Sequence, residues 1–220
     1  MTKHHPTKML LESYVAGELP ASLSAAISIH QEMCLSCSEQ IYLLTQQQAE
    51  HTFSSEHDAM RQETLLPDFS EMIEAIVSDD GIEETTSLDL KVLEIKGKPF
   101  TLPRALTHMD LGRWVNVGKI SRAKLDLNEG ERHSHLLYIE PNGVIPKHTH
   151  KGIEVTLLLE GSFSDEMGEY HAGDFIVLDG NHHHQPMTNT GCLCLTVVDD
   201  ALHFTEGVSK LLNPIGSFIY

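Results

Sequence analysis

The amino-acid sequence predicts two domains, an all-α helical domain that binds zinc followed by an all-β barrel. Apolar residues first recur at helical spacing, and then, after a polar acidic stretch, in short strand-like runs. In the first part, His30, Cys34 and Cys37 place three metal-binding side chains close together. With 220 residues, of which 40% are hydrophobic, the chain is long enough for two small cores. We expect a helical domain at 1–85, a linker at 86–98 and a barrel at 99–215.

Four short helices are predicted in the first domain. Residues 7–16 carry apolar side chains at helical spacing, and Gly17 follows as a stop signal. A second helix covers about 20–33, a third begins near Ser36, and a capping pattern at 67–71 opens a fourth. Helices this short bury little apolar surface, so a bound metal ion is a reasonable source of stability.

The cysteines of the second and third helices suggest a zinc site. Thiolates and neutral imidazoles are the usual ligands of Zn²⁺. His30 and Cys34 are four residues apart and share a helical face, and a following turn can bring Cys37 to the same point. A structural site needs a fourth ligand, for which His4 and His5 are both candidates. The alternatives are a redox thiol pair, although no strand precedes it, and a buried histidine beside two free thiols.

Charge and composition restrict the partners. The formal net charge is −17, with 15 Lys and Arg against 32 Asp and Glu, which opposes direct binding to nucleic acid. Between residues 38 and 90 there are 13 acidic residues and one basic residue, so we expect a basic protein partner or a solvated face. Four cysteines in two close pairs fit a reducing cytoplasm. We expect no signal peptide and no membrane span.

The second part of the chain reads as closely spaced strands. β-branched runs at 114–117, 135–140, 153–160, 174–178 and 193–198 are separated by Gly, Pro and Asn. Strands without intervening helices indicate a sandwich or barrel. The last runs include Cys192 and Cys194, whose Cα atoms would be about 6.5 Å apart on a strand. That separation is near the upper limit for a disulfide. We therefore expect core packing rather than a redox switch.

A second set of metal-binding residues lies among these strands. His148 and His150 are two apart, so on an extended chain they point to one face, and Glu154 can share that face. The loop 182–184 supplies further histidines, among which His184 is our candidate, although alternation also places His182 on that face. Three imidazoles and a carboxylate suit Zn, Mn, Fe or Ni. Solvated histidines are the plainer explanation for such a loop, and His-x-His also occurs at 133–135 without the other residues.

This pattern resembles the cupin family. Its first motif is Gly, a short spacer, His-x-His, Glu and Gly, and here it covers His148, His150, Glu154 and Gly161, with a spacer one residue short. The second motif departs more from the family. Its Gly173 is present, but Asp179 replaces the usual proline and Asn181 the usual glycine, and its histidine falls on His184.

The two parts together resemble the zinc-binding anti-sigma factors of the ChrR type over nearly the whole chain. The features shared with these proteins include the His4-His5 pair, the His-x-x-x-Cys-x-x-Cys segment, the turn at Gly17, His184-Gln-Pro and the Cys192-Leu-Cys pair. The resemblance implies an N-terminal zinc at His5, His30, Cys34 and Cys37, and a divalent metal, expected to be zinc, at His148, His150, Glu154 and His184.

The resemblance also implies a function. The helical domain would bind and inhibit an extracytoplasmic-function (ECF) sigma factor, and the cupin would be needed to release it under singlet oxygen or a related oxidative stress. On this interpretation the chain is a cytoplasmic regulator and not an enzyme. The alternative is a metal-dependent cupin enzyme of the dioxygenase kind, which keeps a coordination position open for substrate. The sequence shows no separate general base for that chemistry.

Overall fold

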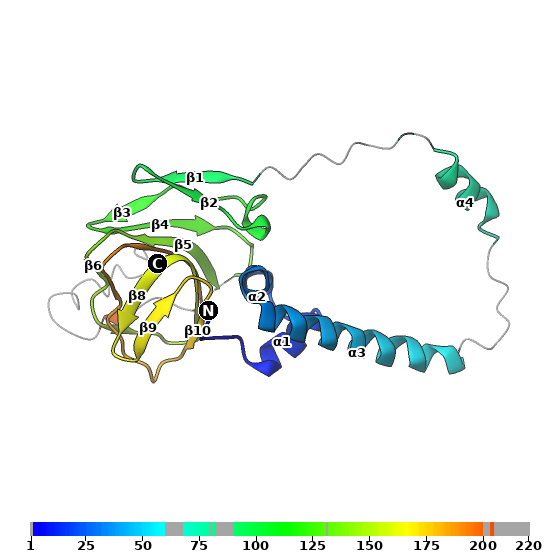
Figure 1. Cartoon of the computed structure of the whole chain (residues 1–220), viewed down its shortest axis with the longest axis horizontal. Helices are drawn as coiled ribbons and strands as arrows, with labels where there is room; N and C mark the ends of the chain where they lie inside the picture. The colour runs from blue at the N-terminus through cyan, green and yellow to red at the C-terminus, as the bar shows by residue number, and fades with distance from the viewer. Residues whose placement is uncertain are drawn as a thin grey trace.

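The computed structural model describes residues 2–59, 68–79, 81, 90–130, 132–199 and 203–204, with side chains left out at 54–59 and 203–204. Within these residues, helices form the N-terminal region and a curled antiparallel β-sheet forms the C-terminal region (Figure 1). Parts of three predictions lie outside the described residues: the start of the fourth helix at 67, the linker at 86–89 and the end of the barrel at 205–215.

The helical region contains four helices in its described part: α1 Lys8–Val15, α2 Ala21–Met33, α3 Leu35–Ala59 and α4 Ser70–Val77. Thr7 caps α1 through its side-chain oxygen, which accepts the N–H of Leu10. α3 continues well past the glutamines at 46–48 to which the sequence pattern extends, and no side chain of α4 is buried. None of the described helices combines the length and the apolar character that a membrane span requires.

A β-hairpin begins the C-terminal region. It is formed by β1 Val92–Ile95 and β2 Lys98–Thr101, which pair antiparallel, and the short 3₁₀ helix η1 Arg104–Leu106 follows it. β1 lies inside the segment 86–98 that the sequence predicts as a linker. The hairpin forms there because Lys96 and Gly97 adopt positive φ in the tight turn, and Ile95 and Phe100 are buried in the apolar core.

The main sheet has the strand order β3-β4-β5-β12-β8-β11-β6, with β9 and β10 also paired to β8, and all of its pairs are antiparallel. A separate pair joins β13 to β7. The strands are β3 Val115–Val117, β4 Ile120–Leu125, β5 His133–Ile139, β6 Gly143–Val144, β7 His148–Thr149, β8 Glu154–Asp165, β9 Gly168–His171, β10 Phe175–Leu178, β11 Met187–Thr188, β12 Cys192–Val198 and β13 His203–Phe204.

The two faces of this sheet form two different apolar clusters, because side chains alternate along each strand. On one face, Leu137, Leu158 and Cys194 belong to a cluster inside the curl of the sheet. On the other face, Leu157, Leu193 and other residues of the same strands join a larger cluster. Each face is therefore buried against different parts of the chain.

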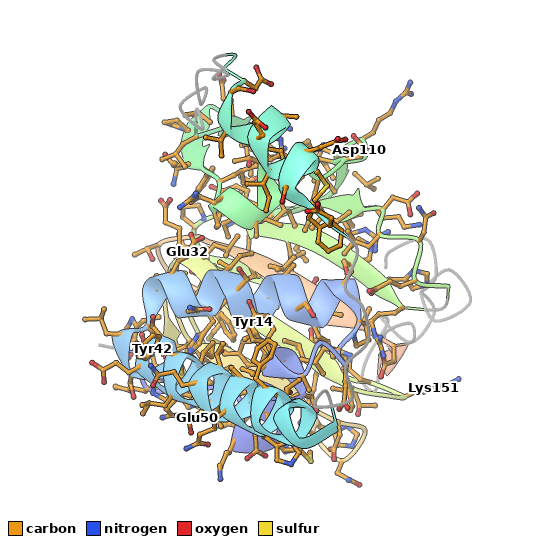
Figure 2. The ribbon with its side chains drawn as sticks, turned by 90° about the vertical axis from the view of Figure 1, so that its right-hand side faces the viewer. Tyr14, Glu32, Tyr42, Glu50, Asp110 and Lys151 are labelled. Carbon is orange, nitrogen blue, oxygen red and sulfur yellow. The ribbon has the colours of Figure 1, made fainter. Side chains whose placement is uncertain are left out.

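The helical region packs on the outer face of the sheet. α2 contacts β8 and β12, and the larger cluster combines Ile27 and Ile29 of α2 with Phe175 and Leu193 of the sheet. Figure 2 shows α2 between α3 and the sheet, and Tyr14 of α1 packs against the same cluster. α1, α2 and the first part of α3 thus share one apolar core with the sheet, whereas α4 contributes no residue to it.

Candidate metal centres

The structure brings His5, His30, Cys34 and Cys37 together at the junction of the helices and the sheet. One ligand atom from each of the four lies within 4.8 Å of the others. The Nδ1 atom of His5 lies 3.4 Å from the Sγ atoms of both Cys34 and Cys37. His30 lies in the last turn of α2, and the break at Cys34 between α2 and α3 brings both thiols close to it. Two imidazoles and two thiols at this spacing match the donor set of a tetrahedral zinc site.

His30 is held in the tautomer that a metal needs. Its Nδ1 donates a hydrogen bond of 2.8 Å to the carbonyl oxygen of Gly173, so the lone pair is on Nε2. That Nε2 atom is buried and has no hydrogen-bond partner. A buried polar atom without a partner is costly. A metal ion bound to Nε2 would remove this cost.

The Cys37 thiol is a poor anion unless a cation lies beside it. Burial, together with the neighbouring Cys34, raises its pKa to about 12. Burial also lowers the pKa of His30, which keeps this imidazole neutral. A divalent cation would reverse the balance at Cys37 because it stabilises the thiolate directly. The donor set of the site therefore fits a metal ion.

Of the two N-terminal histidines, the structure places His5 in this cluster and His4 outside it. The ring of His4 lies against Tyr170, with ring centroids 4.9 Å apart. The sequence could not separate these two adjacent residues, because the choice depends on how residues 3–5 lie against the sheet.

A second group, His148, His150, Glu154 and His184, lies inside the curl of the sheet, again with ligand atoms within 4.8 Å of one another. β7 supplies His148, and β8 begins at Glu154. The backbones of His148 and His184 form an isolated antiparallel bridge, which places the two imidazoles side by side. All four residues are at least 95% buried.

The imidazoles of this group also have their lone pairs directed inward. His148 Nδ1 donates to the carbonyl of Pro146 at 2.9 Å, and His184 Nδ1 donates to the carboxylate of Asp165 at 3.1 Å. Their Nε2 atoms, which then carry lone pairs, face each other at only 2.9 Å. Two facing lone pairs repel unless a proton or a cation lies close to both. This geometry fits a shared metal ion.

Charge at the second group fits the same interpretation. Burial, followed by the charge of His184, lowers the pKa of His148 to about 4, which leaves this imidazole neutral. Burial opposes ionisation of Glu154, but the hydrogen bond and charge of His150, with smaller contributions from His148 and His184, outweigh it and lower the pKa to about 2. Three imidazoles around one carboxylate are a mixed N/O donor set for a divalent metal.

Two other histidines of the C-terminal region, His182 and His135, do not join the inner group. His182 is half-buried and its Nδ1 lies 2.7 Å from Asp179, whereas His184 is buried and joins the inner group. His135 is buried on β5 outside both clusters. Cys192 and Cys194 are buried in the inner apolar cluster, as the core-packing interpretation predicts.

His135 provides a pH-dependent stability that does not involve either cluster. Burial, with smaller contributions from the neighbouring Arg122, His133 and Lys124, lowers the pKa of His135 to about 3. Only the unfolded chain takes up this proton between about pH 6.5 and pH 3, so folding stability falls as pH falls through that window. Between pH 7 and pH 5, the free energy of unfolding measured with urea should fall by about 2 kcal/mol more in the wild type than in His135→Gln. Equal losses in both proteins would contradict this.

Several supporting residues had no sequence signal. Asp165 orients His184 from 19 residues away, and the carbonyl of Gly173 orients His30 from 143 residues away. Asp174 accepts hydrogen bonds from the backbone N–H groups of Lys3 and His4. These contacts depend on tertiary packing, and the Gly173 contact is made by a backbone atom, which no side-chain motif can reveal.

Comparison with known proteins finds similarity in both parts of the chain. Residues 103–200 match the family model described as ChrR Cupin-like domain. The anti-sigma-E factor ChrR of Cereibacter sphaeroides is 28% identical over 222 residues, covering 96% of this chain and 97% of the relative. The crystal structure of Rhodobacter sphaeroides SigE in complex with the anti-sigma ChrR aligns with a TM-score of 0.63 and 25% identity, covering 90% of this chain and 100% of the matched chain.

The chain is similar to ChrR over nearly its whole length. The alignments extend across both regions, so the likeness includes the helices as well as the cupin-like sheet of the ChrR type. A solved RmlC-like cupin of Ralstonia eutropha also aligns, at 14% identity and a TM-score of 0.39, over 44% of this chain and 68% of its own.

Proposed function

We propose that this chain is an anti-sigma factor that binds and inhibits an ECF sigma factor through its helical region. The observation that carries the proposal is the alignment with ChrR in its complex with SigE, which covers 90% of this chain. The donor set at His5, His30, Cys34 and Cys37 supports it, because this cluster ties the N-terminal segment to both α2 and α3. A sigma factor partner would place the chain in the cytoplasm, where RNA polymerase acts.

A transcription assay tests inhibition directly. The assay uses purified RNA polymerase core enzyme, an ECF sigma factor of the same organism and a promoter that this sigma factor recognises. The full chain is then added in increasing amounts. We expect transcript levels to fall in proportion to the chain added, reaching near zero at about one chain per sigma factor. Transcription by the housekeeping sigma factor serves as the control and should not change. Undiminished transcription for every ECF sigma factor of the organism would refute the proposal.

We propose zinc as the metal of both groups. In the helical cluster two cysteines and two histidines match the closed donor sets of structural zinc sites. When bound there, zinc supplies charge that keeps the thiols ionised and a cross-link between segments far apart in the sequence. In the inner group three histidines and one glutamate accept zinc as well as other divalent ions.

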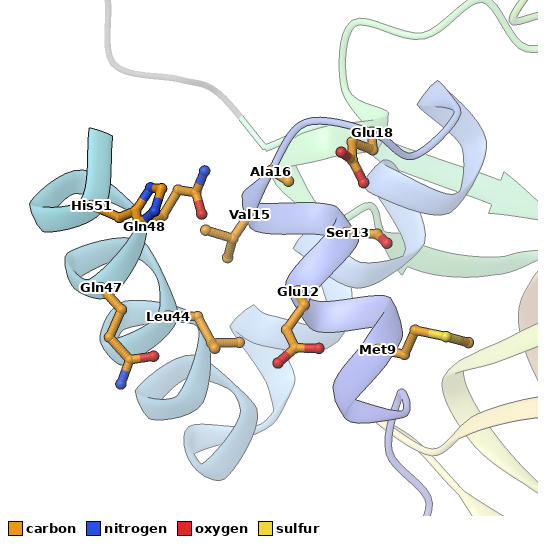
Figure 3. A pocket seen from close by; sticks show the side chains of 10 residues that line it. All are labelled: Met9, Glu12, Ser13, Val15, Ala16, Glu18, Leu44, Gln47, Gln48 and His51. Carbon is orange, nitrogen blue, oxygen red and sulfur yellow. The ribbon is translucent and has the colours of Figure 1, made fainter. Parts of the chain in front are cut away.

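The proposed docking surface lies on α1 and α3. A groove of about 440 Å³ runs between these helices and is lined by Met9, Glu12, Ser13, Val15, Ala16, Glu18, Leu44, Gln47, Gln48 and His51 (Figure 3). Elsewhere on α3, Tyr42, Leu43 and Phe53 expose large apolar side chains. Apolar surface rimmed by acidic and amide groups suits a partner that brings apolar anchors and basic residues. It therefore suits a sigma factor with a basic surface.

Met9 offers a test of this surface because its side chain is 71% exposed at the edge of the groove. The variant Met9→Glu should fold normally, since it removes no core contact, but it places a charge at a proposed apolar contact. We expect the dissociation constant for the sigma factor to rise about tenfold, which corresponds to about 1.4 kcal/mol. Fluorescence anisotropy with labelled sigma factor measures it.

The matched control is Met167→Glu, which introduces the same charge at the exposed turn between β8 and β9 of the sheet. We expect no change in affinity there. If the two variants bind the sigma factor equally well, the groove between α1 and α3 is not the docking surface.

We propose that the inner metal group serves the response to oxidative stress such as singlet oxygen, and not turnover of a substrate. The cavity beside His148, Glu154 and His184 measures about 20 Å³, which is room for about one water molecule. Substrate pockets of enzymes usually measure about 300–1,000 Å³. The small cavity disfavours the dioxygenase-like alternative.

A further inference from the structure

Two candidate ligands of the helical cluster lie on segments that the sheet holds in place. The carbonyl of Gly173 accepts the Nδ1 hydrogen bond of His30 at 2.8 Å. The N–H of Phe175 donates to the carbonyl of His4 at 3.0 Å, one residue before His5. Both contacts come from the start of β10. The short segment 173–175 therefore contacts both the ring of His30 and the backbone next to His5.

Asp174, between these two residues, makes the N-terminal contact stronger. It is 1% exposed, and its Oδ1 accepts the backbone N–H groups of Lys3 at 2.7 Å and His4 at 3.0 Å. Its Oδ2 accepts the N–H of His171 at 2.9 Å, which closes the turn between β9 and β10. Hydrogen bonds to a carboxylate are stronger than those between neutral groups. Asp174 thus anchors residues 3–4 to a rigid turn.

Gly173 adopts φ +95°, and its packing leaves little free space. A Cβ atom at this position would lie 3.0 Å from the Thr2 Oγ1 atom and 3.6 Å from the Cβ of Met33. Glycine therefore allows the backbone of the turn to approach both the N-terminal segment and the end of α2. This close approach is what brings the carbonyl of Gly173 to His30.

We propose that Asp174 is a positioning residue for the helical metal site, acting with the carbonyl of Gly173 to hold His5 and His30 at the metal. The inference rests on the metal ligation proposed above but does not depend on the sigma factor. It means that the helical site is completed by the sheet. The same element reaches the inner group, because Leu178 of β10 pairs with Glu154 of β8. β8 and β10 thus connect the two metal groups.

Cobalt(II) titration of the metal-free full chain tests the proposal. Of the two candidate metal groups among the described residues, the helical cluster is the one with thiol ligands, so we assign a thiolate-to-cobalt charge-transfer band in the near ultraviolet to that cluster. In competition with a chelator, we expect Asp174→Asn to weaken cobalt binding at this band by about 10- to 100-fold, the range found when groups that orient metal ligands are replaced. Zinc release from the loaded protein to a chromogenic chelator should be correspondingly faster.

Two further variants make the result specific. Lys3→Pro removes the donor of the 2.7 Å hydrogen bond to Asp174 and leaves the sheet untouched, so we expect a shift in the same direction of at least threefold. Asp165→Asn replaces the carboxylate that orients His184, so it should leave the thiolate band unchanged.

Wild-type cobalt affinity in both Asp174→Asn and Lys3→Pro would overturn the proposal. If circular dichroism shows that Asp174→Asn does not fold, Lys3→Pro decides alone, and an unshifted titration in that variant overturns the proposal. Because no measurement here involves a sigma factor, failure of the anti-sigma proposal would leave this result standing.

Discussion

Replacing Cys37 by Ser is expected to remove the metal from the helical cluster and abolish sigma factor capture. The hydroxyl of serine is a poor zinc ligand, and the Cys37 side chain is 1% exposed, so the variant also buries a polar group. Structural zinc sites contribute about 10–16 kcal/mol of apparent binding free energy, which is more than a small helical region can lose and remain folded. Metal analysis should fall from two ions per chain to one, and co-purification of the sigma factor should fail.

Cys192→Ala is the matched control, because Cys192 is also buried but belongs to the inner apolar cluster and to neither metal group. It should retain both metal ions and the sigma factor. If the Cys37→Ser protein captures the sigma factor with wild-type affinity, the helical metal is not part of the binding device.

Replacing His148 by Ala is expected to give the opposite division of effects. This change removes a ligand from the inner group, so metal content should again fall from two ions per chain to one. α1 and α3 do not contribute to that group. Because the inner group lies outside the proposed docking surface, sigma factor affinity should remain within about twofold of the wild type. The release of the sigma factor under singlet oxygen should be lost. A photosensitiser in a reporter strain provides the measurement.

His182→Ala serves as the control, since His182 is a half-buried histidine near the inner group that does not belong to it. We expect normal metal content and a normal response. Loss of sigma factor capture by a folded His148→Ala protein would show that the roles of the two regions are not separate.

The donor pattern of each metal group could be predicted from local spacing. His148 and His150 lie two apart on an extended segment, and His30 and Cys34 lie four apart on α2 and its end. Such periodicity fixes which side chains share a face before any tertiary contact is known. The main strands of the sheet were predictable for the same reason, because their β-branched runs are interrupted by turn residues.

The remaining features depend on contacts between distant residues. β1 has an apolar, strand-like sequence but directly follows the polar, acidic stretch that marks the predicted linker, and it forms because it pairs with β2 and packs Ile95 into the core. The packing of α2 on β8 and β12 could not be predicted either, since an amphipathic helix does not indicate which surface it covers. The hydrogen bonds from His30 to Gly173 and from Lys3 to Asp174 follow from that packing.

The most direct test of the central claim is to mix the purified, zinc-loaded full chain with each ECF sigma factor of its organism and measure complex formation by size-exclusion chromatography with light scattering. We expect at least one of these sigma factors to form a stable complex with the chain at one to one, and we expect the complex to be lost when a chelator removes the zinc. If the fully metal-loaded chain forms a complex with none of the ECF sigma factors, it is not an anti-sigma factor for this class.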